Sequence, residues 1–188
     1  MMGVQGSITM CMADQNPARH RSDDLDNARH IAEGMFTAAG RDGIELFIDT
    51  FMDLDRGHGV RNGVIDRWCN PRPAMSVVRN LCAIMAPVRG RSCRVDRGML
   101  NAGRWISRGQ GDEMLLLILP NSPSREFVLE GPVPEFRDGC HEAVDLVAGT
   151  VRPVEARPGK EGGVLDFGSS VSGALLVWLS PGRQANAP

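Results

Sequence analysis

The first half of the chain combines two short apolar runs with two longer stretches in which apolar residues recur at helical spacing. Residues 7–13 and 44–49 have the length and composition of strands. Residues 23–39 and 71–85 repeat apolar side chains every three or four positions, which predicts two amphipathic helices. The run at 44–49 has little polar alternation and favours a strand with apolar residues on both faces. This half therefore predicts the order β-α-β-α.

Residues at the expected helix ends support both helices. Ser22, Asp23 and Asp24 offer capping oxygens and negative charge at the start of the first helix, and Gly40 follows its end. Asn70 precedes the second helix, where asparagine is a good cap and the prolines after it tolerate the first turn. We therefore expect a short loop followed by a helix after residue 70.

From about residue 90 the pattern changes to short strand-like runs separated by turns rich in glycine and proline. Seven strands are expected, at residues 103–107, 113–119, 125–129, 142–146, 150–154, 163–167 and 174–179. Such spacing is typical of an antiparallel β-sandwich. We predict an α/β part at residues 1–88 and a β-sandwich domain at residues 89–188.

Composition and charge narrow the classes of function. The 188 residues are 42% hydrophobic and 23% charged, as in ordinary soluble globular proteins. A net charge of -2 with dispersed arginines predicts no nucleic-acid partner. The longest apolar run, residues 114–119, is far shorter than the roughly 20 residues of a spanning helix, so no membrane partner is expected. The N-terminal residues lack the features of a secretory signal, which predicts a cytoplasmic location.

The spacing of cysteine, histidine and acidic residues predicts neither a metal nor a cofactor. The five cysteines are odd in number and form no C-x-x-C pair. Asp53, Asp55 and Gly57 begin like a calcium loop, but Val64 stands at the twelfth position, where glutamate is required.

Two segments resemble the last quarter of a (β/α)8-barrel glycoside hydrolase. They read ADQNPARHRSDDLDNARHIAEGMF and IELFIDTFMDLDRGHGVRNGVIDRWCNPRPAMSVVRNL. The resemblance implies an α/β plus all-β fold: a partial (β/α)8 barrel of two β/α units, matching the seventh and eighth, followed by an antiparallel β-sandwich. It also implies that the chain belongs with a missing N-terminal barrel portion.

The resemblance implies O-glycosyl hydrolysis by two carboxylates in the intact family. The acid/base residue is expected after the fourth strand, which this chain lacks. The nearest acid to the nucleophile position after the seventh strand is Asp14, where the family has glutamate, and Asp14 serves equally well as a loop cap. We therefore expect the isolated chain to be inactive.

The loop after residues 44–49 holds the candidates for substrate contact. Donors and acceptors suited to sugar hydroxyls gather there: Asp49, Asp53, Asp55, Arg56 and His58. The competing interpretation, which we rank first, is that these aspartates pair with nearby arginines and shape the loop.

Two other functions stay open from the sequence. One is a carbohydrate-binding or protein-interaction module without catalysis, which an exposed aromatic row on one sheet face would favour. The other is a subunit that completes its half-built barrel by self-association. Among Trp68, Trp105 and Trp178, we would test Trp105 as a ligand platform, although core burial is the first expectation for it.

Overall fold

The chain divides into two compact units. The first comprises Met1–Ser92 with Leu146–Gly149, and the second comprises Cys93–Asp145 with Thr150–Pro188. The computed structural model describes residues 6–11, 23–39, 41, 43–49, 51–52, 63–86, 93–110, 113–131, 136–159 and 162–179. Each unit has a β-sheet of its own.

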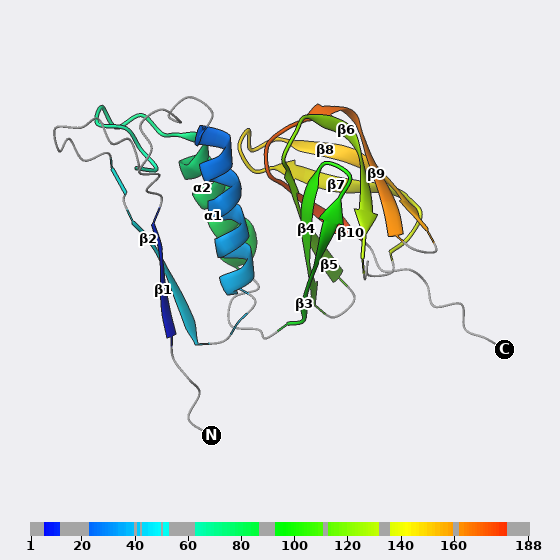
Figure 1. Ribbon diagram of the computed structural model, residues 1–188, viewed down its shortest axis with the longest axis horizontal. Helices are drawn as coiled ribbons and strands as arrows, with labels where there is room; N and C mark the ends of the chain where they lie inside the picture. Colours follow the sequence, from blue (N-terminus) through cyan, green and yellow to red (C-terminus); the bar gives the residue numbers. More distant parts are fainter. Residues whose placement is uncertain are drawn as a thin grey trace, which may run out of the picture. The chain divides into compact units, whose positions relative to one another are not determined.

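The first unit has the predicted β-α-β-α order. Its elements are β1 (Gly6–Cys11), α1 (Asp23–Ala39), β2 (Ile44–Asp49) and α2 (Pro73–Met85), as Figure 1 shows. The two strands are parallel, and their register runs from Gly6 opposite Ile44 to Cys11 opposite Asp49. Parallel neighbours need a crossover connection, and α1 lies in that connection.

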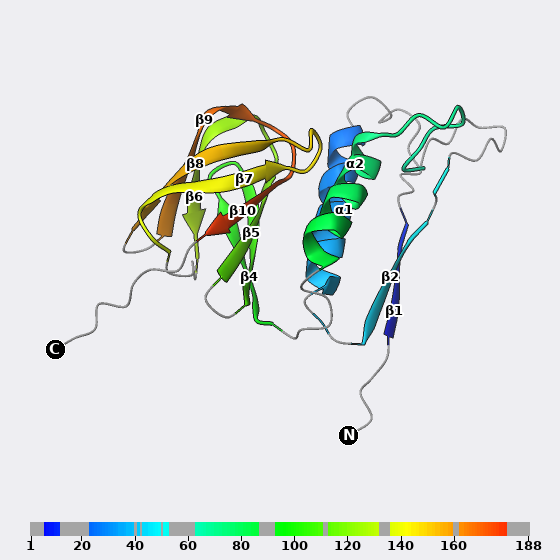
Figure 2. The same cartoon turned by 180° about the vertical axis from the view of Figure 1, so that it is seen from behind.

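Both helices lie on one side of the β1–β2 pair, as the opposite views in Figures 1 and 2 show. The helices pack against each other. The thioether of Met10 packs against Gly34 of α1. It occupies the space that a β-carbon at position 34 would fill. The fully or nearly fully buried side chains of the helices are Ala28, Ile31, Ala32, Phe36, Ala74, Val77, Leu81 and Met85.

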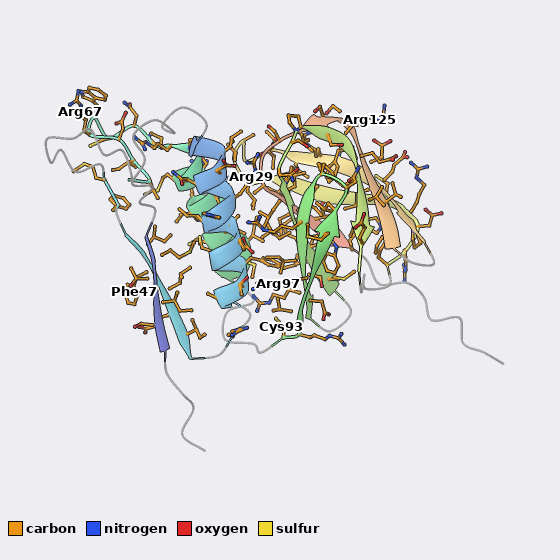
Figure 3. All side chains as sticks on the ribbon, viewed as in Figure 1. Arg29, Phe47, Arg67, Cys93, Arg97 and Arg125 are labelled. Atoms are coloured by element: carbon orange, nitrogen blue, oxygen red, sulfur yellow. The ribbon has the colours of Figure 1, made fainter. Side chains whose placement is uncertain are left out.

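In the described residues, no helix or strand covers the opposite face of the β1–β2 pair, which we call the bare face. Strand alternation places Ser7, Thr9, Glu45 and Phe47 on this face, and all four are exposed. Phe47 is 52% exposed, and Figure 3 shows its ring directed away from the helices. Within the described residues each strand pairs only with the other, so both outer edges are open. A two-stranded sheet in this state is marginal by itself.

The start of α2 differs from the sequence prediction. Asn70 does not cap the helix; the residue before the helix is Arg72, whose backbone is extended and whose side chain makes no capping hydrogen bond. Pro73 occupies the first turn, where its missing N–H costs nothing. Asn70 instead bonds to the carboxylate of Asp66, because a local turn competes successfully for its amide.

The second unit is an antiparallel β-barrel. Its strands are β3 (Val95–Leu100), β4 (Gly103–Gln110), β5 (Glu113–Pro120), β6 (Ser124–Glu130), β7 (Gly139–Asp145), β8 (Val151–Pro158), β9 (Gly162–Val171) and β10 (Leu175–Leu179). They follow one another in the order β10-β5-β4-β3-β6-β9-β8-β7, and β10 closes the ring by pairing with β7.

The predicted β-sandwich is therefore wrong in its architecture. The strand at Val95–Leu100 was not expected, and it bridges β4 and β6. Sandwiches and barrels show the same alternation of inward and outward residues, so the pattern within each strand does not distinguish them. Two strands decide the architecture: β3 joins β4 to β6, and β10 joins β5 to β7, so the sheet closes on itself.

Trp105 lies in the barrel core rather than at a ligand site. Its side chain is fully buried, and its indole Nε1 donates a hydrogen bond of 3.0 Å to the carbonyl oxygen of Glu130. Gly98 on β3 lies opposite Trp105, and a β-carbon there would collide with the indole ring and with the same carbonyl. These contacts exclude Trp105 as a platform for ligands.

Candidate functional site

The carboxyl ends of β1 and β2 meet at one edge of the first unit, because the strands are parallel. Cys11 and Asp49 are the last residues in register there. Ligands of α/β folds bind at this edge. The other residues predicted for the site lie outside the described residues, and their roles stay predictions: Asp14, Asp53, Asp55, Arg56 and His58.

A turn between β2 and α2 is tied to the end of β2. The backbone N–H of Ile65 donates to the carbonyl of Phe51 at 3.1 Å, and Ile65 also pairs with Met52 in a parallel bridge. Ile65 bridges to Pro71 on its other side. The residues from 65 to 71 are therefore held next to the carboxyl edge of the sheet.

Asp66 organises this turn. Its carboxylate accepts hydrogen bonds from the backbone N–H groups of Trp68 and Asn70, both at 2.8 Å, and from the side-chain amide of Asn70 at 2.9 Å. These bonds, led by that of the Asn70 side chain, lower the pKa of Asp66 below its usual 3.8. Cys69 has a φ of 65°, which few residues other than glycine adopt. The turn thus has a defined backbone.

Trp68 projects from this turn into solvent. Its side chain is 66% exposed, and the guanidinium carbon of Arg67 lies 4.1 Å from the centre of its ring, a cation–π contact. Figure 3 places Arg67 at the far end of the loop region from Phe47. The exposed side chains of Phe51 and Met52 stand in the same region of the chain, directly after β2.

Trp68 was not among the residues predicted for the site from the sequence. The signal was present in its surroundings, since Trp68 stands in DRWCNPRP, where aspartate, asparagine and two prolines favour a turn. Turns lie at the surface, so a tryptophan within one is exposed. Trp105 instead stands in a strand, where alternation decides its burial.

The second unit has a shallow depression on the β7–β8 surface. Its volume is about 350 Å³, and its lining includes His141, Glu142 and Arg152. His141 is largely buried, lies 2.9 Å from the carbonyl of Arg137 through Nε2, and meets the Phe136 ring edge to face. Arg152 lies 3.8 Å from the carboxylate of Asp145. These groups serve the barrel's own structure.

The described residues of the barrel form no exposed aromatic row of the kind that would favour carbohydrate binding by a sheet face. Among its described residues, the large apolar side chains that are exposed are Met99, Val128 and Val151, and none is aromatic. The described part of the chain holds no group of three or more histidine, cysteine or acidic side chains arranged for a metal ion. Neither α1 nor α2 has the length and apolar character needed to cross a bilayer.

Comparison with known proteins finds similarity in structure alone. No protein-family model matches the sequence, and no curated protein matches it. A family 39 glycoside hydrolase from Bacteroides cellulosilyticus WH2 aligns with a TM-score of 0.51 and 12% identity over 84% of this chain and 30% of its own. A maltogenic α-amylase from Thermotoga neapolitana aligns with a TM-score of 0.53 and 12% identity over 96% of this chain and 42% of its own.

The chain therefore spans less than half the length of either hydrolase. At 12% identity, TM-scores of 0.51 and 0.53 show a likeness of fold alone. The fold of this chain is similar to part of glycoside hydrolase chains.

Proposed function

We propose that this chain is the C-terminal part of a glycoside hydrolase-like protein. In this proposal the first unit supplies the last two β/α units of a (β/α)8 barrel, and the second unit is the β domain that follows. The observation that supports this proposal most is the parallel β1–β2 pair, with helices on one face and, among the described residues, exposed side chains on the other. A (β/α)8 barrel has its helices outside and packs the other strand face inside.

The bare face then corresponds to the barrel interior. Ser7 and Thr9 of β1 and Glu45 and Phe47 of β2 are exposed here, and further strands would cover them in the complete barrel. The two open edges of the sheet are the places where those strands would pair. These added strands would give hydrogen-bond partners to the backbone groups at the two edges, and they would also cover the exposed apolar surface.

Carbohydrate is the proposed ligand of the carboxyl edge. Aspartate, arginine and histidine side chains donate and accept hydrogen bonds as sugar hydroxyls require. The residues proposed for this contact are Asp49, Asp53, Asp55, Arg56 and His58. The maltogenic α-amylase among the similar structures makes an α-glucan the first polymer to test.

Binding is tested by native electrophoresis of the full chain in gels with and without soluble starch. We expect starch to retard the chain, and the double variant Asp53→Asn/Asp55→Asn to be retarded less. The matched control is Glu142→Gln/Glu155→Gln, which removes the same charge from exposed barrel residues. The proposed contact is contradicted if the two double variants are retarded equally, or if starch does not retard the parent chain.

The isolated chain is proposed to lack hydrolase activity. Glycoside hydrolysis needs two carboxyl groups on opposite sides of the scissile bond, about 5 Å apart in retaining enzymes. The acid/base position of the resembled family falls in a barrel unit outside this sequence. We expect no release of nitrophenol from a panel of nitrophenyl glycosides by the purified chain, and reproducible turnover overturns this part of the proposal.

A protein-interaction role is the second candidate function. Phe47 and Phe51 are exposed, and the sheet edges are open in the described residues. Both observations favour a role in which the chain adds its two strands to the sheet of another polypeptide. In that case hydrolysis would belong to the complex. This candidate is contradicted if the chain stays monomeric when it is mixed with a polypeptide that carries six β/α units.

A further inference from the structure

We propose that Trp68 is a stacking platform for a pyranose ring of the bound carbohydrate. This inference rests on the proposed function, since it takes carbohydrate as the ligand of the carboxyl edge. It adds a residue outside the predicted polar set and assigns it an apolar contact with the sugar.

The exposure of Trp68 is the first argument. Among the large apolar side chains that the structure describes, Trp68 has the highest exposed fraction, 66%. Exposing a large apolar ring to water is unfavourable, so a ligand that covers the ring gains binding free energy. The ring faces of aromatic side chains suit flat, weakly polar partners, and one side of a pyranose ring presents C–H groups of that kind.

The fixed backbone beneath the ring is the second argument. Asp66 accepts hydrogen bonds from the N–H groups of Trp68 and Asn70, and Cys69 holds the left-handed conformation that closes the turn. An ordered turn loses little conformational entropy when a ligand binds. The turn therefore presents the indole in a prepared position.

Arg67 gives the platform one covered face and a set of donors. Its guanidinium lies over the indole, 4.1 Å from the ring centre, so the opposite ring face is left for the ligand. Guanidinium N–H groups donate to hydroxyl oxygens at the rim of a stacked sugar. A neutral hexopyranose matches a ring face next to such donors.

The location of the turn is the third argument. The hydrogen bond from Ile65 to Phe51 anchors it to the residues that follow β2, on the carboxyl side of the parallel pair. The predicted polar contacts from Asp53 to His58 lie in the chain between Phe51 and this turn. Trp68 therefore lies on the side of the strand pair where ligands of α/β folds bind.

The test is a titration of the ¹⁵N-labelled full chain with maltohexaose at millimolar concentrations, followed through the indole N–H signals of its three tryptophans. We expect the Trp68 signal to move. The Trp105 signal is the internal control and should stay fixed, because that indole is buried and bonded to Glu130. Trp68→Ala identifies the signal by its absence and should weaken binding roughly 2- to 10-fold.

Trp68→Phe should keep part of the affinity, since phenylalanine also offers a ring face. Met99→Ala removes an exposed apolar side chain from the second unit and should bind as the parent chain does. Circular dichroism of each variant verifies that it is folded. An unmoved Trp68 signal, or equal affinity of Trp68→Ala and the parent, overturns the inference.

The outcomes separate this inference from the proposed function. If starch retardation depends on Asp53 and Asp55 and is unchanged in Trp68→Ala, the inference fails and the proposed contact stands. If glycerol moves the Trp68 signal as maltohexaose does, the shift is a general solvent effect, and the inference also fails.

Discussion

The side-chain amide of Asn70 donates a 2.9 Å hydrogen bond to the carboxylate of Asp66. Trp68 lies between these residues in the chain and donates its own backbone N–H to the same carboxylate. The position of the exposed indole therefore depends on the ionised form of Asp66. This dependence connects the pH of the solution to the proposed sugar platform.

The turn should loosen in acid. The pKa of Asp66 is lowered below 3.8, mainly by the Asn70 side chain. A folded-state pKa below the unfolded value means that the carboxylate stabilises the turn above 3.8 and loses this effect as the pH falls through the lowered pKa. We expect the amide signals of Trp68 and Asn70 to shift together in that range. A variant Asp66→Asn should show no such transition, and a midpoint above 3.8 contradicts the assignment.

The ion pair between Arg125 and Asp166 should set a second acid transition, in the barrel. Two hydrogen bonds of 2.9 Å join the guanidinium of Arg125 to the carboxylate, and they are the main cause that lowers the pKa of Asp166 to about 2. The stabilising effect is present above 3.8 and is lost as the pH falls toward 2. The Arg125 side chain is 63% exposed and that of Asp166 is 14% exposed, so salt should weaken the stabilising effect in part.

Carboxyl-carbon NMR titration measures this effect directly. Arg125→Gln should raise the pKa of Asp166 toward 3.8. The control Arg157→Gln should raise it less, because Arg157 contributes only a weaker charge effect. Equal shifts in the two variants would show that the hydrogen bonds of Arg125 are not the main cause.

Gly98 should tolerate no side chain. A β-carbon there would meet the Trp105 ring and the Glu130 carbonyl, so Gly98→Ala should lower the free energy of unfolding by about 1–3 kcal/mol. Gly109→Ala on the neighbouring strand is the matched control, because nothing lies within 4 Å of its β-carbon position. Urea denaturation of both variants gives the comparison. Equal stability of the two would mean that β3 does not pack on Trp105 as described.

The bare face of the first unit should bind apolar dyes. Phe47 is 52% exposed on a sheet whose edges are open in the described residues, and exposed apolar side chains beside open strand edges bind dyes or promote self-association. Phe47→Ser should reduce both dye fluorescence and association. Val151→Ser, at an exposed site on the barrel, should change neither. A monomeric parent chain that binds no dye contradicts the bare-face interpretation.

Local patterns predicted the elements of the first unit well. The helix at 23–39 and the strand at 44–49 match the structure in their bounds, because a clear three-to-four periodicity and flanking glycines leave few alternatives. The cap at Asn70 could not be read from sequence in the same way. Whether asparagine caps a helix or bonds to a nearby aspartate depends on the turn geometry around Cys69.

The barrel was harder to predict because closure is a long-range property. The strand Val95–Leu100 contains Asp96, Arg97 and Gly98, which obscure its alternation. Gly98 is explained by two groups distant in the chain, the Trp105 ring and the Glu130 carbonyl. The choice between Trp68 and Trp105 likewise depended on which one the fold buries. For Trp105 the first expectation, core burial, agrees with the structure, because strand alternation turns its side chain inward.

If the first unit is part of a larger β/α barrel, as proposed, the rest of that barrel must be found with this chain. The most direct test is the intact mass of the native polypeptide, captured from its source cells with an antibody against α2 and analysed together with whatever it binds. We expect a polypeptide well above 20.4 kDa whose additional sequence carries β/α units, or a stable complex with a chain that carries them. A monomeric 20.4 kDa protein without a companion would contradict it.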